Sequence, residues 1–432
     1  MRILFLSNFY PPHALGGYEQ WCQEVADGLS ARGHHVFVLT SRHGANGEPP
    51  EPVAAGEPYV RRTLHLQADV HYYRPLDFFS QRRTQERENL DELHGAIEHF
   101  NPDVIMVWGM WNLSHMLPYL AEQRMGDRVC YYVSSYWPLD LDLHIQYWTL
   151  PTRRIWLRPF KKPFAALALA QLRGEEYPPP LRFDHAVCCS NYVRNTLVEQ
   201  GALPESANVL LGGTEPDLFL EYAANRRTKK NNVLQMIYFG RLVHDKGVHT
   251  AIEALGHLRE RQLLQRVKLT ILGNGHPDYE RQLRELAKEK GVQERVQFAR
   301  QIPREDIVKV LGRFDLFLFT SIWPEPMARS VMEAMAAGLL VIGTTVGGQG
   351  EMLKHGHNGL TFPAENATVL ADRIDQALNE PALRSQLAKA GQNMVIEQYT
   401  LERMIIEIEQ FLMSVAWNPG QRLLALPDFQ AR

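Results

Sequence analysis

The sequence predicts an α/β protein made of two doubly wound domains, and three observations lead to this fold class. Its 432 residues exceed what one hydrophobic core usually organises. Short apolar runs alternate with amphipathic helical segments, which is typical of parallel sheets covered by helices. The alternation stops in the polar, basic stretch EYAANRRTKKNN at residues 221–232 and then starts again. We therefore expect two α/β domains of similar size joined by a polar connector.

The first half contains six short runs that we expect to form strands. The N-terminal run ILFLS precedes a helix expected from about Glu19 to Arg32, and Gly33 ends that helix. Most of the runs are apolar throughout rather than alternating, which fits strands buried on both faces of a sheet. The runs that follow the first are HVFVLT, DVIMVW, RVCYYV, HAVCCS and NVLLGG.

The second half repeats this pattern. We place the first domain at residues 1–215, the second at 216–398, a further helix at 399–417 and a tail at 418–432. Two such domains side by side predict a cleft at the carboxyl ends of their strands, where α/β sheets bind ligands. The runs expected to form strands are VLQMIYFG, VKLTILG, RVQFAR, FDLFLFTS and LLVIGT.

Composition and charge exclude several classes of protein. A formal net charge of -3 gives no overall basic character of the kind that nucleic-acid-binding proteins have. The four cysteines form no CxxC pair and lie in apolar runs, so we expect reduced core residues in a reducing compartment. The N-terminal apolar stretch is too short for a signal peptide, and no run reaches the ~18 apolar residues that span a bilayer. These features predict a cytoplasmic protein.

Two regions do not follow the alternation. Residues 43–58 form a Gly/Pro-rich loop in the sequence, and residues 138–183 have no regular pattern. The centre of the second region is basic, aromatic and free of acidic residues. One interpretation is a peripheral contact with the inner face of an anionic membrane through residues 148–172. The other is an irregular lid packed by its own aromatic side chains.

Two strand-to-helix turns carry features that suit phosphate. Gly16 and Gly17 precede the first helix, and adjacent glycines let a backbone approach an anion at a helix N-terminus. Arg241 follows a predicted strand and Lys246 stands just before the next helix, a pair of cations that suits a diphosphate. The alternatives are a tight turn in the first case and solvated surface charges in the second.

The stretch SIWPEPMARSVMEAMAAG contains two glutamates separated by seven residues. Glu325 lies just before a predicted helix, and Glu333 lies inside it, about 8 Å from its start at a rise of ~1.5 Å per residue. One interpretation is a charged loop followed by a solvated helix face. The other is a ligand that lies across the helix N-terminus and has an acidic residue at each end.

Four segments, which occur along the chain in the same order as in that family, resemble motifs of the family 4 retaining glycosyltransferases. These enzymes have the GT-B architecture of two Rossmann-like domains facing a central cleft. The resemblance covers nearly the whole chain and is strongest from Tyr238 to Phe362. The stretch PEPMARSVMEAMAAG resembles the E-x7-E motif of that family. The other three segments are PPHALGGYE, FGRLVHDKG and GGQGEMLKHGHNGL.

This resemblance implies a retaining, metal-independent transfer of a sugar from a nucleoside diphosphate sugar to the hydroxyl of a carbohydrate, lipid-linked or small-molecule acceptor, as in polysaccharide or glycoconjugate biosynthesis. Glu325 would hold the donor sugar and Glu333 the ribose. The helix at 399–417 would cross back to the first domain. The implied catalytic residues are Glu325 and Ser134, and the implied donor-binding residues are Gly16, Gly17, Arg241, Lys246, Met327, Ala328, Arg329 and Glu333.

The sequence departs from the family pattern at three of these positions. Ala328 stands where the family usually has glycine, Arg329 follows it, and Ser134 stands where the family commonly has a histidine beside the donor sugar. Two alternatives therefore stay open: a GT-B epimerase acting on the nucleotide-sugar itself, and a degenerate member that binds without catalysis. We attribute no metal site to the DLD sequence at Asp140–Asp142, because such spacing is common by chance.

Overall fold

The computed structural model describes residues 1–14, 16–44, 58–152, 156, 158–224 and 233–417. The chain forms two compact units. Unit 1 consists of Met1–Cys189, Val193–Leu210 and the chain from Ile405 onward, and unit 2 consists of Ser190–Tyr192 and Leu211–Met404. The proposed tail at 418–432 and most of the loop at 43–58 lie outside the described residues.

Unit 1 is built on a seven-stranded parallel sheet with the order β3-β2-β1-β4-β5-β6-β7. The central strands β4 and β5 are buried along their whole length and β1 from Ile3 onward, as their continuous apolar runs predict, whereas most of the edge strand β3 is half-buried or exposed. The strands are β1 (Arg2–Ser7), β2 (His35–Ser41), β3 (Tyr59–Leu64), β4 (Val104–Gly109), β5 (Val129–Val133), β6 (His185–Cys188) and β7 (Asn208–Val209).

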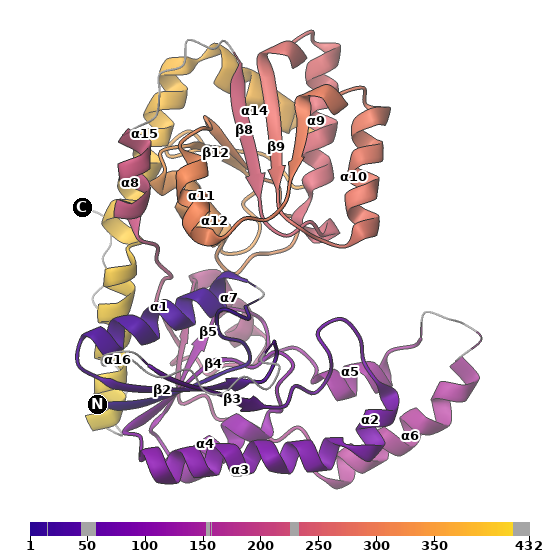
Figure 1. Cartoon of the computed structure of the whole chain (residues 1–432), viewed down its shortest axis with the longest axis vertical. Helices are drawn as coiled ribbons and strands as arrows, with labels where there is room; N and C mark the ends of the chain where they lie inside the picture. Colours follow the sequence, from indigo (N-terminus) through magenta and orange to yellow (C-terminus); the bar gives the residue numbers. More distant parts are fainter. Residues whose placement is uncertain (15, 45–57, 153–155, 157, 225–232, 418–432) are drawn as a thin grey trace. The chain divides into compact units, whose positions relative to one another are not determined.

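Helices cover both faces of this sheet (Figure 1). The strand order reverses between β1 and β4, so a topological switch point lies at the carboxyl ends of these two strands. The four cysteines are free and buried, as expected. The helices are α1 (Gly17–Ala31), α2 (Pro75–Ser80), α3 (Arg82–Phe100), α4 (Met116–Met125), α5 (Leu143–Thr149), α6 (Arg158–Gly174) and α7 (Asn191–Glu199).

The expectation of an irregular segment at 138–183 is wrong, because the structure forms α5 and α6 there. The Ala- and Leu-rich second half of α6 favours a helix, although Pro163 lies inside it. Ala168 and Leu172 of α6 are buried in an apolar cluster with Phe78 of α2 and Trp148 of α5. Tertiary burial of this stripe therefore stabilises a helix that the proline would weaken. Helices α2, α5 and α6 gather at one side of unit 1 (Figure 1).

Unit 2 contains a six-stranded parallel sheet with the order β10-β9-β8-β11-β12-β13. This order again reverses once, between β8 and β11, so the second switch point lies there. The strands are β8 (Leu234–Phe239), β9 (Val267–Leu272), β10 (Val296–Ala299), β11 (Leu316–Phe319), β12 (Leu340–Gly343) and β13 (Leu360–Thr361).

An apolar core packs helical residues 248–258, 279–287 and 367–378 against the sheet of unit 2. Among the described residues of the whole chain, no helix has both the length and the apolar character needed to cross a bilayer. The helical segments are α8 (Pro216–Ala224), η2 (His244–Lys246), α9 (Val248–Glu260), η3 (Leu264–Arg266), α10 (Pro277–Glu289), η4 (Gln293–Arg295), α11 (Arg304–Leu311), α12 (Arg329–Ala336), α13 (Gln349–Met352), α14 (Ala367–Asn379) and α15 (Pro381–Gln398).

The last helix, α16 (Leu401–Trp417), belongs to unit 2 in its first turn and to unit 1 from Ile405 onward. Inside unit 1, Glu409 accepts hydrogen bonds from Arg32 Nε at 2.8 Å and pairs with His34 Nε2 at 2.6 Å. Burial alone would raise the pKa of Glu409, but these two partners outweigh it and lower the pKa below its ordinary value of 4.5. The carboxylate thus ties α16 to the end of α1.

We predict that Glu409→Gln destabilises the protein by ~1–2 kcal/mol at pH 7, because it removes a charged acceptor from two donors. A lowered carboxyl pKa contributes stability above the unfolded value, near 4.5, which is lost as the pH falls through the folded value. The difference in thermal midpoint between wild type and variant should therefore shrink below pH 4.5. Glu205→Gln, at an exposed position of unit 1, is the control. A constant difference from pH 7 to pH 3 would contradict the role of the ionised carboxylate.

Candidate functional site

The candidate site lies at the carboxyl edge of the unit-2 sheet, at its switch point. Lys246 ends the 3-10 helix that follows β8, and Glu325 lies in the loop that follows β11. Because β8 and β11 are neighbouring parallel strands, both loops leave the same edge of the sheet. The topology therefore brings together two residues that are 79 positions apart in the sequence.

Lys246 and Glu325 form an ion pair between Nζ and Oε1. The hydroxyl of Ser321 donates to the same carboxylate oxygen at 2.8 Å. The Glu325 side chain is 11% exposed and that of Lys246 is 20% exposed, so water screens this pair only partly. Sequence reasoning missed Ser321, although its position two residues after the buried strand β11 is the signal that could have indicated it.

Backbone contacts fix the two loops against each other. The hydroxyl of Thr320 donates to the Lys246 carbonyl at 2.7 Å, and Ile322 N–H donates to the Asp245 carbonyl at 2.8 Å. Gly247 has a φ of 62°, and a Cβ at this position would lie 2.1 Å from the Thr320 carbonyl oxygen. Only glycine permits this approach, so the ion pair stands on a rigid backbone rather than on two free loops.

A third loop, between β12 and α13, packs against Glu325 from the other side. Gly348 N–H donates to the Glu325 carbonyl at 2.8 Å. Gly347 has a φ of 70°, and a Cβ there would lie 2.3 Å from the same carbonyl oxygen. A Cβ on Gly348 would lie 2.0 Å from the carbonyl oxygen of Pro326. This glycine pair therefore has a packing role that positions the acidic loop.

Helix α12 carries the second glutamate. Glu333 is the fifth residue of this helix, and its Oε1 accepts from Arg329 Nε at 3.1 Å. The two side chains are 7% and 6% exposed, so the pair is buried. Ala328 is the N-cap residue, and its N–H donates to Gln349 Oε1 at 3.3 Å. Met327 is also buried in this segment.

Each acidic residue of the motif is therefore paired with a cation: Glu325 with Lys246, and Glu333 with Arg329. Arg241 leaves the same edge of the sheet after β8 but is exposed. Its carbonyl accepts from Tyr238 Oη at 2.8 Å, which holds the turn in place. The structure thus brings Lys246 to Glu325 and leaves the guanidinium of Arg241 open to solvent.

The other predicted residues lie in unit 1. Gly16 is the N-cap residue of α1 and Gly17 its first residue. Gly16 N–H donates to Glu19 Oε2 at 2.9 Å, so a carboxylate already occupies this helix N-terminus. Ser134 follows β5 directly and is buried. A phosphate at Gly16 would have to compete with the Glu19 carboxylate.

Hydrogen bonds within the protein engage Asp142 of the DLD sequence. Asp142 Oδ2 accepts from Tyr177 Oη at 2.5 Å and from Gln67 Nε2 at 2.5 Å, and its Oδ1 accepts from the amide of His144 at 3.0 Å. Across the residues that the structure describes, no three His, Cys, Asp or Glu side chains are grouped as metal ligands. Burial lowers the pKa of His144 to about 4, so its ring is neutral, and Tyr73 hydrogen-bonds it.

Two family models match the chain, one in each half. A model described as Glycosyltransferase Family 4 matches residues 15–218. A model described as Glycosyl transferases group 1 matches residues 223–394.

Relatives of similar length match almost the whole chain. Glycogen synthase of Mycobacterium tuberculosis is 24% identical over 441 residues, covering 99% of this chain and 98% of that protein. N-acetyl-alpha-D-glucosaminyl L-malate synthase of Bacillus anthracis is 26% identical over 438 residues, covering 96% and 98%.

Solved structures share the two-domain fold. Sucrose-phosphate synthase of Thermosynechococcus elongatus has a TM-score of 0.71 at 18% identity, covering 96% of this chain and 98% of that one. HepE of Anabaena, solved in complex with UDP, has a TM-score of 0.66 at 19% identity, covering 96% and 100%. These likenesses confirm the predicted GT-B architecture of two parallel-sheet, Rossmann-like domains.

We predict that Gly347→Ala lowers the thermal midpoint more than Gly356→Ala does. Both glycines have a positive φ, 70° and 72°, so alanine costs a similar backbone strain of ~1–3 kcal/mol at each. Only at Gly347 would the added Cβ also meet the backbone of Pro324 and Glu325, whereas nothing lies within 4 Å at Gly356. Equal midpoints for the two variants would show that the loop after β12 does not support the Glu325 loop.

Proposed function

The chain belongs to the glycosyltransferases, with a family 4 half and a group 1 half, and from this premise we propose that its donor is a nucleoside diphosphate sugar. The relatives named above are synthases whose products are carbohydrates or glycosides, and HepE has been solved with UDP and with UDP-glucose. The sugar would pass from this donor to an acceptor hydroxyl.

The observation that carries this proposal is the Lys246–Glu325 pair at the switch point of unit 2. A bound diphosphate brings at least two negative charges to the carboxyl edge of this sheet. Arg241 and Lys246 supply cations there, and the N-terminus of α12 favours negative charge. These groups would stabilise the charge that develops on the leaving diphosphate. Lys246 would then exchange part of its contact with Glu325 for phosphate oxygens.

Glu325 would hold the donor sugar and Glu333 the ribose. Ser321 keeps one Glu325 oxygen hydrogen-bonded when Lys246 turns to the diphosphate. Arg329 would neutralise Glu333 and limit its use as an acceptor for the ribose hydroxyls. Met327 and Ala328 lie between the two glutamates in the sequence and would also contact the donor.

Further residues would act from unit 1. Gly16 and Gly17 would approach the phosphates, and Ser134 would take the place of the histidine usual in the family. Retention of configuration and independence of metal ions are proposed from the resemblance to family 4.

We propose a carbohydrate, lipid-linked or small-molecule acceptor, and a cytoplasmic enzyme that contacts the inner face of a membrane. Support for the contact comes from an apolar patch formed by α2 and α6. Phe160, Phe164 and Leu167 of α6 recur at helical spacing and are 68%, 53% and 59% exposed. The ring of Phe164 meets that of Phe79 in α2, where Leu76 is 76% exposed.

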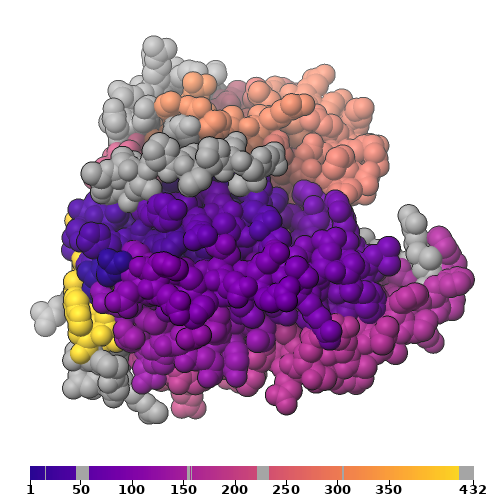
Figure 2. All heavy atoms as spheres, turned by 60° about the horizontal axis from the view of Figure 1, so that its bottom comes forward, coloured from indigo at the N-terminus to yellow at the C-terminus, as the bar shows by residue number. Residues whose placement is uncertain are grey.

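The position and charge of this patch suit an anionic bilayer. Figure 2 shows α6, in magenta, at a projecting edge of unit 1. Residues 143–174 contain no Asp or Glu, whereas Arg158 and Lys162 are exposed next to the apolar side chains. Aromatic side chains flanked by cations are typical of helices that lie in the interface of anionic lipids.

For the donor, we predict that the nucleotide-sugars of one base, among UDP-, GDP-, ADP- and dTDP-sugars, raise the thermal midpoint of the protein. A ligand at a hundred times its dissociation constant adds ~2.7 kcal/mol to the free energy of unfolding. Calorimetry should then show roughly tenfold or weaker affinity in Lys246→Ala and in Arg241→Ala, since each removes a charge-assisted hydrogen bond. Lys288→Ala, an exposed lysine of α10, is the control. Wild-type affinity in both site variants would refute the diphosphate site.

Calorimetry of donor binding, combined with an assay of donor consumption with and without an acceptor pool, separates the two glutamates. Glu333→Ala should mainly raise the donor dissociation constant, because a ribose contact is equal in ground and transition states. Glu325→Ala should lower turnover, because charge develops at the sugar. Ser134→Ala should leave turnover largely unchanged if another group serves in place of the histidine. Activity that persists in EDTA would agree with metal independence, and donor conversion without acceptor would instead indicate an epimerase.

For the membrane contact, we predict that the protein sediments with phosphatidylglycerol vesicles but not with phosphatidylcholine vesicles. The double variant Phe160→Ser, Phe164→Ser should weaken binding at least tenfold, since each buried aromatic side chain contributes ~1.5–3 kcal/mol. Leu218→Ser, at a 48% exposed position of α8, is the matched control. Failure of the wild type to sediment, or equal sedimentation of the double variant, would rule out the patch as the anchor.

A further inference from the structure

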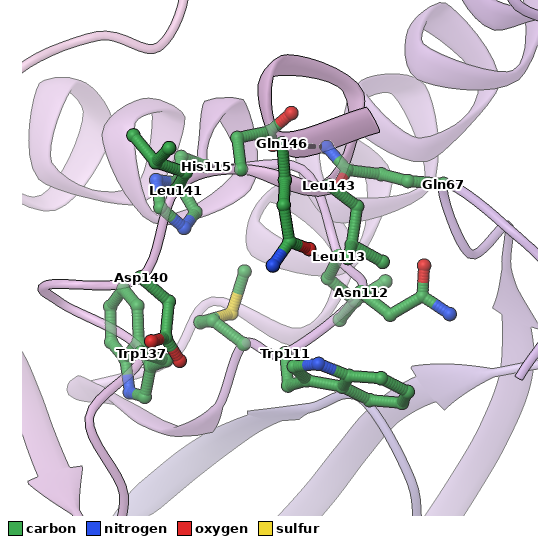
Figure 3. A pocket seen from close by; sticks show the side chains of 12 residues that line it. Gln67, Trp111, Asn112, Leu113, His115, Trp137, Asp140, Leu141, Leu143 and Gln146 are labelled. Atoms are coloured by element: carbon green, nitrogen blue, oxygen red, sulfur yellow. Dashed lines mark hydrogen bonds between the residues drawn. The ribbon is translucent and has the colours of Figure 1, made fainter. Parts of the chain in front are cut away.

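A recess of about 130 Å³ opens at the carboxyl edge of the unit-1 sheet (Figure 3). Its walls come from three separate connections: Gln67 after β3, residues 110–113 after β4, and residues 137–143 after β5. Gln146 of α5 reaches into it from above in this view. The recess therefore occupies the edge at which doubly wound sheets bind ligands, within unit 1 itself.

Part of the wall is fixed by hydrogen bonds made inside the protein. Asn112 is buried, and its side-chain amide exchanges two hydrogen bonds with the backbone of Ala68, at 2.9 and 2.8 Å. Asp142 is held by Gln67 and Tyr177, each at 2.5 Å. These internal hydrogen bonds hold Asn112 and Asp142 in place, so this part of the wall is ordered before a ligand binds.

Three other polar side chains of the lining have no such partners. Within the described residues, the side chains of Asp140, Gln146 and His115 make no hydrogen bond to the protein, although all three line the recess. Asp140 is exposed, and the partial burial of its carboxyl group still raises its pKa; burial lowers the pKa of His115, so the ring is neutral. A carboxylate, an amide and an imidazole together offer both acceptors and donors to a ligand rich in hydroxyl groups.

Two indole rings complete the lining. Trp111 is 37% exposed, and Trp137 is buried with its ring 5.4 Å from that of His115. The backbone of Trp111 is anchored by Asn8, whose Nδ2 donates to its carbonyl at 2.8 Å. Flat aromatic surface beside a few convergent polar groups suits a ring that has an apolar face and a polar edge, as a pyranose has.

The charge of the lining selects among such rings. Its twelve residues include two carboxylates, Asp140 and Asp142, and neither lysine nor arginine. A phosphate or carboxylate on the ligand would meet like charge with no cation to pair with, at a cost that grows as water is excluded. Uncharged or positively charged ligands meet no such penalty.

We propose that this recess is a carbohydrate site that binds a neutral or amino sugar and not an anionic one. The sugar bound there is the acceptor of the transfer reaction, a step that rests on the proposed function. Asp140 and Gln146 bind its hydroxyl groups, and Trp111 packs against its apolar face. The acceptor class is thereby narrowed to glycans and glycosides whose terminal sugar carries no negative charge.

The test is saturation-transfer NMR on the full chain without donor, which detects weak binding directly. The probes are the methyl glycosides of glucose, galactose, mannose and N-acetylglucosamine, together with glucosamine, glucuronate and glucose 6-phosphate. We expect a saturation-transfer signal for at least one neutral or amino sugar, and none for glucuronate or glucose 6-phosphate. Asp140→Asn should weaken that binding roughly tenfold, as expected for a hydrogen bond to a charged group, and Trp111→Ala should weaken it similarly.

Asp91→Asn, an exposed carboxylate of α3 outside the recess, should bind like wild type. Absence of saturation for every neutral and amino sugar, or undiminished saturation in both recess variants, would overturn the site. Saturation of glucuronate or glucose 6-phosphate as strong as that of the neutral sugars would overturn the assignment by charge. Calorimetry of nucleotide-sugars on the same preparation tests the donor separately: sugar binding without any nucleotide binding would count against the proposed function, not against the recess.

Discussion

The close approach of three loops at the carboxyl edge of unit 2 is the constraint on which its candidate site depends. The loop after β11 meets the loops after β8 and β12 at backbone atoms, and glycine occupies the position of closest contact in both pairings. Gly247 lies against the Thr320 carbonyl, and Gly347 and Gly348 lie against the carbonyls of Glu325 and Pro326. Any side chain there would push Glu325 away from Lys246, because the clash is with backbone that cannot rotate aside.

This packing has an electrostatic consequence. Glu325 and Glu333 are two poorly solvated carboxylates near one helix N-terminus. Each is compensated by an ion pair, Glu325 with Lys246 and Glu333 with Arg329. The Lys246–Glu325 pair is partly exposed and can exchange partners, because a lysine ammonium is a mobile point charge. The Arg329–Glu333 pair is buried on one helix face and is harder to separate. The Lys246–Glu325 end of the site is therefore adjustable, and the Arg329–Glu333 end is fixed.

Unit 1 places two surfaces of opposite character next to each other, and α5 connects them. Gln146 of α5 points into the carboxylate-lined recess, while Trp148 of the same short helix is buried in the apolar cluster beneath α6. Lys161 of α6 donates to the Leu150 carbonyl at 2.7 Å, which ties α6 to the end of α5. An acceptor sugar carried on a lipid would find two features on a single framework: the proposed sugar site, whose lining contains no lysine or arginine, and a cationic, apolar patch.

The sequence by itself determined the strand–helix alternation, both parallel sheets and the glutamate pair, because continuous apolar runs and helical spacing are local signals that a parallel sheet requires. It did not predict α6, whose proline argues against a helix until Ala168 and Leu172 are buried in a distant cluster. Nor could it show that Lys246 meets Glu325, that Arg329 meets Glu333, or that Glu19 occupies the N-terminus at Gly16. Those partners depend on strand order, side-chain direction and competition between nearby charges. The recess was decided by tertiary structure alone, since Gln67, Trp111 and Asp140 come from three connections and Gln146 from α5, which only the folded sheet brings to one edge.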